Sequence, residues 1–297
     1  MQRARAPTSL TYLERVNRVV DHVVTHLEQP LRLEAMARLA HLSPFHFHRV
    51  FQAIAGETLS DFVKRRRLER ALSLMAGTKP ASLTRIAASC GFSSSSDFSR
   101  SFRQRYGVPP RAFDLEAWRR EHLSELQSAM PRVDKLPARS NPDGFAVRVR
   151  DLPARFVAYI RVRNPYKGDG VLRAAKRLEA WARERGIADR QWLGYQWENP
   201  EIVPLKDCHY HVAVESDRFV PSGEVGCFRF PAMTVAQVEI RGDVHLELRA
   251  LQWLYGSWLP RSGYVPADQP GFEAWIGRPF AHGTSYFEVL VQLPVRR

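Results

Sequence analysis

Residues 86–113 read IAASCGFSSSSDFSRSFRQRYGVPPRAF, and this stretch decides the fold of the first half of the chain. Residues 83–89 overlap the start of this stretch. Their apolar side chains recur with the i, i+3, i+4 spacing of one helical face, which predicts a short helix. Gly91 then suits a tight turn, because glycine adopts positive φ without steric cost. We expect Ser94 to cap a second helix that ends at Gly107. The stretch therefore predicts a helix-turn-helix.

The second helix has two chemically different faces. Phe98, Phe102 and Tyr106 follow one another at a spacing of four, which predicts an apolar stripe against the core. The outward face carries small hydroxyls and guanidinium groups. In a DNA major groove, arginine pairs with guanine and serine reaches bases or phosphates. This face is therefore a candidate for reading DNA.

A similar motif, AHLSPFHFHRVFQAIAG, lies 51 residues earlier, at residues 40–56. Four of its residues, Phe47, Arg49, Phe51 and Gly56, stand where Phe98, Arg100, Phe102 and Gly107 stand later. The phenylalanines are expected in the core and the two arginines outside. Two such units in one chain can occupy successive major-groove faces about 34 Å apart without dimerisation.

The paired motifs resemble the DNA-binding domain of the AraC/XylS family of transcription activators. The second motif has the family's order of Gly-Phe, Phe-x-Arg-x-Phe and Gly-x-x-Pro. The resemblance implies promoter DNA as a partner, entered through the major groove, and RNA polymerase as another. Carried over by position, the base-reading residues are Phe45, His48, Arg49, Ser95, Ser96, Ser99 and Arg100.

A helix predicted over residues 58–75 would join the two motifs. It carries a basic run, Lys64 to Arg67, followed by Arg70. These side chains could contact DNA phosphates, or they could only make the surface soluble. The sequence leaves both interpretations open.

Charge and length indicate two domains of different character. The chain has 297 residues, and residues 1–130 hold 20 Lys and Arg against 12 Asp and Glu, so they carry +8 of the net charge of +13. That distribution suits phosphate neutralisation by the first half. No apolar run is long enough for a membrane span. Three cysteines without a CxxC pattern favour the reducing cytoplasm.

We expect a loose tail at residues 1–9, an all-α DNA-binding domain with two helix-turn-helix units at 10–127, a linker at 128–144 and an α+β domain at 145–297. The linker prediction depends on a proline-rich, aperiodic composition. In the last domain a strand-helix-strand-strand pattern occurs twice, with Val157 matching Val235 at an offset of 78. Two such halves are expected to form a cleft.

This half resembles the GyrI-like domain, the effector-binding half of the regulators Rob and BmrR. The supporting phrases are LPARFVAYIRV, LGYQWENPEIVPLKDCHYHVAV, VEIRGDV, LYGSWLPRSGY and YFEVLVQLP. The resemblance implies a small-molecule effector, a lipophilic cation held by a buried glutamate among aromatic rings. The candidates are Glu288 as the carboxylate and Tyr195, Trp197, Tyr264, Trp275 and Tyr286 as the walls.

Other functions remain as alternatives. The GyrI-like half could hydrolyse small electrophiles, with Glu288 as base and Tyr286 as its orienter, or it could be vestigial in a constitutive DNA binder. His209 and His211 share a strand face, but no third metal ligand is evident, so we predict no metal site. The chain lacks GxGxxG, Walker, HExxH and GxSxG patterns, so we predict neither a cofactor nor a catalytic residue.

Overall fold

The computed structural model describes residues 8–76, 81–131, 136–137 and 140–297. Most of the tail predicted at 1–9 lies outside these ranges, and its last two residues belong to helix α1 (Thr8–Thr25). Residues 132–135 and 138–139 of the predicted linker also lie outside them. None of the helices in the described ranges combines the length and apolar character that a membrane span needs.

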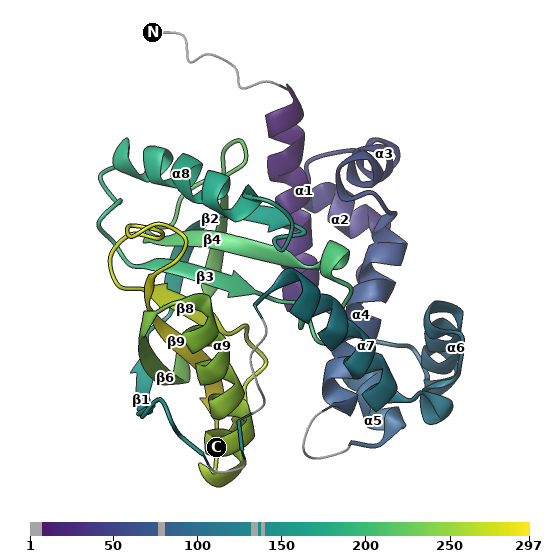
Figure 1. The fold of residues 1–297 in the computed structure, drawn as a ribbon. Helices are drawn as coiled ribbons and strands as arrows, with labels where there is room; N and C mark the ends of the chain where they lie inside the picture. The colour runs from purple at the N-terminus through teal and green to yellow at the C-terminus, as the bar shows by residue number, and fades with distance from the viewer. Residues whose placement is uncertain (1–7, 77–80, 132–135, 138–139) are drawn as a thin grey trace, which may run out of the picture. The chain divides into compact units, whose positions relative to one another are not determined.

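The chain forms two compact units. The first comprises the chain up to Leu123 together with residues 201–203 and 221–226, and the second comprises the remainder. The helices of the first half are α1, α2 (Leu33–Leu39), α3 (Pro44–Ala55), α4 (Leu59–Met75), α5 (Leu83–Ser89), α6 (Ser95–Tyr106) and α7 (Leu115–Ala129). Helix α4 packs against α3, α5 and α6, so it joins the two motifs as predicted (Figure 1).

Matching local signals delimit the two outward helices. In α3 the Ser43 hydroxyl accepts the N–H of His46, and Gly56 ends the helix at φ 81°. In α6 the Ser94 hydroxyl plays the same role, and Gly107 ends the helix at the same φ. A hydroxyl that satisfies a free N–H and a glycine in the left-handed region define a helix locally. Helix α6 therefore ends before Gly107 as predicted, and α5 covers the predicted residues 83–89.

The predicted core residues of both motifs are buried. Phe47 and Phe51 of α3 are fully inaccessible, and so are Phe98 and Phe102 of α6. The last helix of this half does not begin directly after Pro109. A 3-10 turn comes first, and the Asp114 carboxylate then accepts the N–H of Ala117 at 2.9 Å and starts α7.

The second half is built on a nine-stranded sheet. Its elements are β1 (Arg148–Leu152), β2 (Arg155–Arg163), α8 (Gly170–Arg183), β3 (Trp192–Gln196), β4 (His209–Ser216), β5 (Gly226–Phe230), β6 (Met233–Gly242), α9 (Val244–Trp253), β7 (Val265–Pro266), β8 (Phe272–Trp275) and β9 (Phe287–Arg296). The strand order is β1-β6-β9-β8-β3-β4-β2-β5, and β7 pairs with β9. The repeated strand-helix-strand-strand unit, β2-α8-β3-β4 and β6-α9-β8-β9, is confirmed, whereas β5 and β7 were not predicted.

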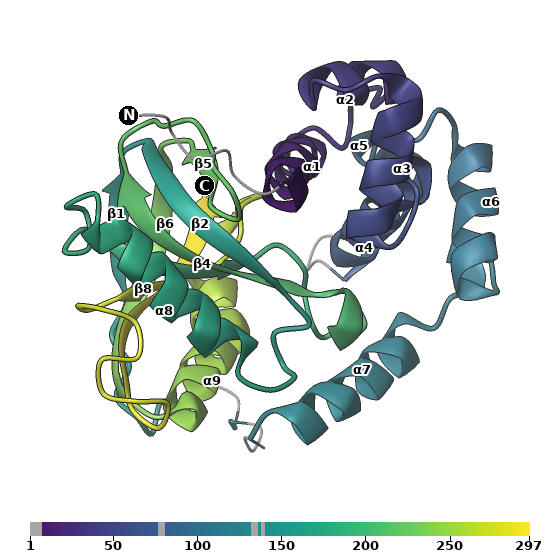
Figure 2. The same cartoon turned by 90° about the horizontal axis from the view of Figure 1, so that it is seen from above.

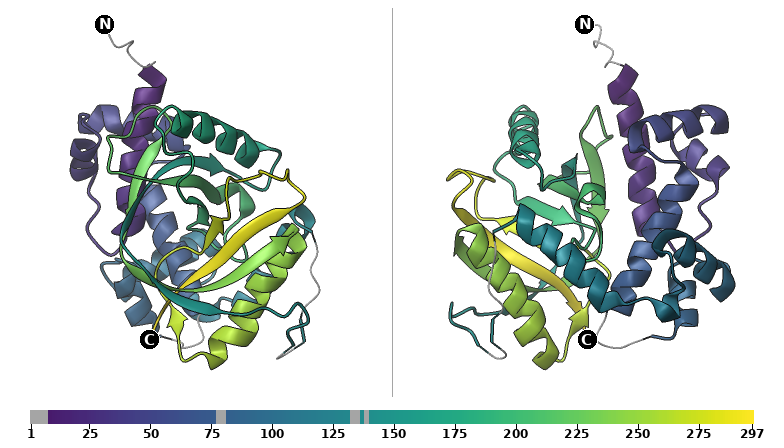
Figure 3. Two further views of the ribbon diagram at one scale, coloured as in Figure 1. Left: turned by 90° about the vertical axis from the view of Figure 1, so that its left-hand side faces the viewer. Right: turned by 45° about the vertical axis from the view of Figure 1, so that its right-hand side comes forward.

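The sheet has a helix-covered face and an aromatic face. Helix α8 packs against β2 and β4, and α9 packs against β6 and β9 (Figure 2). The opposite face holds an aromatic cluster that includes Tyr159, Tyr195, Phe228, Phe230 and Phe272. The sheet curls strongly (Figure 3), and the Arg155 guanidinium of β2 lies 4.9 Å from the centre of the Phe272 ring of β8, across two intervening strands.

Candidate functional site

The outward face of α3 carries the three predicted readers of the first motif. Phe45 is 74% exposed, Arg49 is exposed and His48 is half-buried. The Arg49 guanidinium lies 5.8 Å from the centre of the Phe45 ring, so a cation and an apolar ring are presented side by side. This face is opposite the buried phenylalanines of the helix.

The outward face of α6 carries the predicted readers of the second motif. Ser95, Ser96 and Arg100 are exposed, and Ser99 is half-buried. At the start of α6 the Ser94 hydroxyl accepts the Asp97 N–H at 3.0 Å, and the Asp97 carboxylate accepts the hydroxyl of Ser93 at 3.0 Å. Within the described ranges Arg100 forms no hydrogen bond or ion pair, and the same holds for Arg49. Both guanidinium groups therefore remain available to a ligand.

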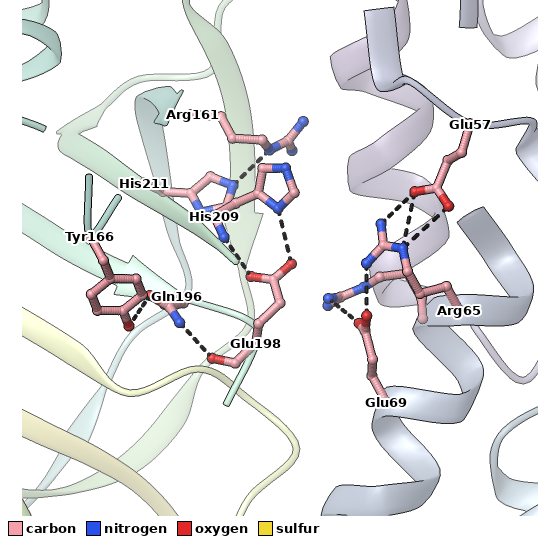
Figure 4. A network of polar contacts seen from close by, with 10 residues as sticks. Glu57, Arg65, Glu69, Arg161, Tyr166, Gln196, Glu198, His209 and His211 are labelled. Atoms are coloured by element: carbon pink, nitrogen blue, oxygen red, sulfur yellow. Dashed lines mark hydrogen bonds and ion pairs between the residues drawn. The ribbon is translucent and has the colours of Figure 1, made fainter. Parts of the chain in front are cut away.

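Three of the five basic residues on α4 are held by protein groups, so these three are not available to contact DNA phosphates. Arg65 and Arg66 are buried. Arg65 donates to Glu57 at 2.7 Å and to Glu69 at 2.8 Å, and Arg66 donates to Glu69 at 2.8 Å (Figure 4). Burial opposes the charge of Arg65, but the two carboxylates outweigh burial and raise its pKa. Arg67 is also occupied, because it donates to two backbone carbonyls at 2.8 Å.

Glu288 does not lie in an aromatic cage. Its side chain is 21% exposed and accepts from Arg241 at 3.1 Å, with the His282 imidazole at 3.6 Å. Tyr286 is 40% exposed and packs edge-on against His282. On the same strand Val289 and Val291 are buried, so alternate residues of β9 around Glu288 point into the core.

The predicted wall residues do not gather around Glu288. Tyr195 and Trp197 belong to the aromatic cluster on the helix-free face of the sheet. Tyr264 stacks on Trp258 beyond the end of α9. Trp275 packs with Phe280 and Phe287. The six predicted effector residues are thus divided among four places in the second unit: Tyr195 with Trp197, Tyr264, Trp275, and Tyr286 with Glu288.

A different pair of carboxyl groups lies on the helix-covered face. The Tyr210 hydroxyl of β4 donates to the Glu273 carboxylate of β8, although β3 runs between these strands. The contact is possible because Gly194 of β3 has no side chain, and a Cβ there would collide with the Tyr210 hydroxyl. Glu247, on the first turn of α9, is electrostatically coupled to Glu273.

The environment of these carboxyl groups favours their neutral forms. Burial, followed by the Glu273 charge, raises the pKa of Glu247 well above 4.5. Burial also raises the pKa of Glu273, although the Tyr210 hydrogen bond opposes this effect. Both residues keep some accessible surface even though protein atoms crowd around them. Two crowded carboxyls without a basic partner among the described residues suit a cation that displaces the proton.

On the aromatic face, His211 and His209 are engaged by protein groups (Figure 4). The Nε2 atom of buried His211 accepts from Arg161 at 2.9 Å, and its ring stacks on Tyr195 at 4.5 Å. Burial, followed by the Arg161 charge, lowers the pKa of His211 well below 6.5. The Nδ1 atom of His209 lies 3.3 Å from Glu198. Within the described residues no group of three potential ligands could hold a metal ion.

Comparison with known proteins matches both halves. The model of a helix-turn-helix domain matches residues 36–115, and that of the GyrI-like small molecule binding domain matches residues 145–296, half of the chain. The chain belongs to the GyrI-like family. Residues 36–115 form an AraC-type helix-turn-helix domain.

Among curated proteins, the chain is similar to the probable transcriptional regulator LumQ of Photobacterium leiognathi, with 33% identity over 35% of this chain and 42% of LumQ. It is also similar to the regulatory protein PocR of Salmonella typhimurium, with 31% identity over 41% of this chain and 39% of PocR. The chain thus spans less than half the length of these relatives. Among solved structures, the DNA-binding domain of AdpA in complex with a target DNA has 26% identity over 36% of this chain and 96% of that chain, with a TM-score of 0.33.

The carboxyl pair of this GyrI-like domain had a detectable sequence signal. Gly194 interrupts a strand of large residues, Trp-Leu-Gly-Tyr, and a glycine within a strand often marks the close approach of another group. Glu273 is the one charged residue in Phe-Glu-Ala-Trp, a short strand with aromatic ends. The pairing of β3 with β8 brings these two residues opposite each other. Only the fold reveals that pairing.

Proposed function

We propose that the protein is a transcription regulator that binds specific promoter sequences through α3 and α6 and responds to a small molecule bound by its GyrI-like domain. The observation that carries this proposal is the pair of like-built helices that bury phenylalanines and expose Arg49 and Arg100 without hydrogen-bond or ion-pair partners in the described ranges. Such a regulator would act in the cytoplasm, on promoters bound by RNA polymerase.

Each helix offers chemistry suited to base edges. A guanidinium donates two hydrogen bonds to guanine, and a good bidentate pair contributes about 1–3 kcal/mol of discrimination. Phe45 beside Arg49 can contact a thymine methyl group. The serines of α6 are short, so Arg100 carries most of the base-specific reach of the second motif.

Selection from a randomised duplex library tests the DNA-binding proposal. The full chain should enrich one bipartite sequence, which it should bind about 10³-fold or more tightly than a scrambled duplex at the same salt concentration. Enrichment of no sequence, or equal affinity for both duplexes, would contradict sequence-specific regulation. Mapping of the selected sequence upstream of genes then identifies promoters to be tested for activation.

For the effector we propose a lipophilic cation held by Glu273 and Glu247 rather than by Glu288. The support is electrostatic, because burial favours the neutral forms of both carboxyl groups and no described residue forms an ion pair with either of them, whereas Glu288 is already paired with Arg241. A bound cation would favour ionisation of the pair and so release a proton. Aromatic Tyr210 supplies an adjacent ring.

Calorimetry with tetraphenylphosphonium, and with neutral triphenylphosphine oxide as comparator, tests the effector proposal. We expect the full chain to prefer the cation, Glu273→Gln to weaken its binding at least tenfold, and Glu288→Gln to leave it unchanged. If only Glu288→Gln weakens binding, the site lies at Glu288. If the chain shows neither heat nor a thermal shift with cations, the cation proposal fails and a vestigial second domain is favoured.

The same groups support a second candidate function, hydrolysis of small electrophiles. The specific observation is the Tyr210–Glu273 hydrogen bond beside a second carboxyl group with a raised pKa, because one carboxylate could act as base and the protonated carboxyl as acid. Product formation from an epoxide by the full chain, abolished in Tyr210→Phe, would favour the enzyme. Binding without product would favour the regulator, in keeping with the regulators to which the chain is similar.

A further inference from the structure

A cavity of about 350 Å³ lies at the C-terminal end of α9, well away from the carboxyl pair. Its lining residues are Asn141, Trp253, Ser257, Trp258, Arg261 and Ser262. Glu247 lies on the first turn of the same helix, so at 1.5 Å per residue it is roughly 15 Å from Ser257 along the axis. We propose that this cavity is a second ligand site and that it binds a small planar aromatic carboxylate.

The backbone is irregular where the cavity forms. Helix α9 continues as a π-helical turn over Leu254–Trp258 and then as a 3-10 turn over Leu259–Arg261. A π-turn closes i to i+5 hydrogen bonds, is wider than an α-turn, and occurs often at functional sites. The wider turn brings residues i, i+4 and i+5 to one side, so Trp253, Ser257 and Trp258 line the same cavity.

The polar groups of the cavity divide into occupied and available ones. Asn141 is occupied, because it both donates to and accepts from the backbone of Phe145 at 2.9 and 2.8 Å. Ser262 is likewise occupied, donating to the Leu259 carbonyl and accepting the Tyr264 N–H. These two residues hold the walls in place.

The available groups are donors. Ser257 is only 6% exposed, and its hydroxyl has no hydrogen-bond partner among the described residues. Arg261 uses Nε to bind the Ser257 carbonyl at 2.8 Å, and over the described ranges its two terminal nitrogens bind nothing. The indole N–H groups of Trp253 and Trp258 are also unbonded within the described part of the chain. The cavity thus offers donors and a positive charge.

This combination selects the ligand class. Among the described residues that line the cavity none is acidic, so none of these side chains competes with an anion for Arg261. The guanidinium fork matches a carboxylate with two parallel hydrogen bonds. The two indole side chains offer flat apolar surface for a ring. The volume is near the lower end of the roughly 300–1,000 Å³ typical of ligand pockets, which favours a small molecule.

Isothermal titration of the full chain with indole-3-acetate tests the proposal, with indole-3-acetamide as the neutral comparator of equal shape. We expect the acetate to bind at least tenfold more tightly than the amide. Arg261→Met should remove that preference, and Ser257→Ala should weaken acetate binding several-fold without removing the preference. Arg218→Met is the matched control, because Arg218 is exposed and unbonded among the described residues, and it should bind as the unchanged chain does.

Three results would overturn the proposal: no heat with the acetate, equal affinity for acetate and amide, or an equal loss in Arg218→Met and Arg261→Met. If Arg261→Met proves unstable, the several-fold weaker acetate binding expected of Ser257→Ala still tests the site, and unchanged binding by that variant would also overturn the proposal. Glu273→Gln should retain indole-3-acetate binding, so failure at this cavity is distinguishable from failure of the cation site.

Discussion

Replacing Glu69 by Gln should destabilise the DNA-binding half strongly. The Glu69 side chain is 7% exposed and accepts from two buried guanidinium groups, those of Arg65 and Arg66, at 2.8 Å each. A glutamine side chain at this position would have nearly the same shape but no negative charge, and one of its terminal atoms would be an NH₂ donor facing an arginine. The buried guanidinium groups of Arg65 and Arg66 would then lose the negative charge of Glu69, and Arg65 would keep only that of Glu57.

The expected magnitude follows from the remaining partners. Removing one member of a buried ion pair destabilises a protein by about 3–5 kcal/mol, because it leaves an uncompensated buried charge. Here Glu57 still accepts from Arg65 at 2.7 Å, so we expect the lower end, about 3 kcal/mol. That corresponds to roughly a hundredfold increase in the population of the opened state.

Hydrogen–deuterium exchange of α4 peptides is the appropriate assay, because it reports local opening in a chain with two units. Glu28→Gln is the matched control, since Glu28 is 46% exposed and lies 3.4 Å from Arg70, and it should change the opening free energy by at most about 0.5 kcal/mol. Equal small effects of the two substitutions would refute the buried-network reasoning.

Three further predictions concern other residues. Gly194→Ala should abolish tetraphenylphosphonium binding in calorimetry, because its Cβ would break the hydrogen bond between Tyr210 and Glu273; unchanged binding would contradict the site. Glu247→Gln should flatten the pH dependence of thermal stability above pH 4.5. Because the pKa of Glu247 is raised in the folded chain, this group keeps a proton there that it releases above pH 4.5 in the unfolded chain. The unchanged protein therefore loses stability as pH rises. A variant whose stability has the same slope with pH would refute the assignment. Gly91→Ala should destabilise the helical half by more than about 2 kcal/mol in urea titrations, because Gly91 has φ +79° and a Cβ would collide with a backbone carbonyl; an unaltered midpoint would contradict this.

The helical half was largely predictable because its signals are local. Ser94 and Gly107 act on backbone groups a few residues away, so α6 could be delimited from the sequence. The interior position of Phe98 and Phe102 followed from helical spacing alone. The fate of the basic run was not predictable in this way. Whether Arg65 meets phosphate or carboxylate depends on Glu57, eight residues away beyond a helix boundary.

The ligand-binding half shows the same limit more clearly. The choice of Glu288 as the effector carboxylate could not take into account that Arg241 from β6 stands opposite Glu288 and pairs with it. The carboxyl pair arises from β8 and α9, with Tyr210 from β4. Strand order decides that grouping, and periodicity within one strand carries no information about strand order.

Base-by-base mapping of the selected duplex with Arg49→Ala and Arg100→Ala tests the central claim most directly, with Arg120→Ala of α7 as an exposed control. Each variant should lose about 1–3 kcal/mol of binding free energy at fixed salt and relax specificity at its own set of base pairs, the two sets lying about one helical turn apart. Arg120→Ala should preserve the specificity. Loss of specificity at one shared set of base pairs, or unchanged maps for both variants, would contradict two separately reading helices.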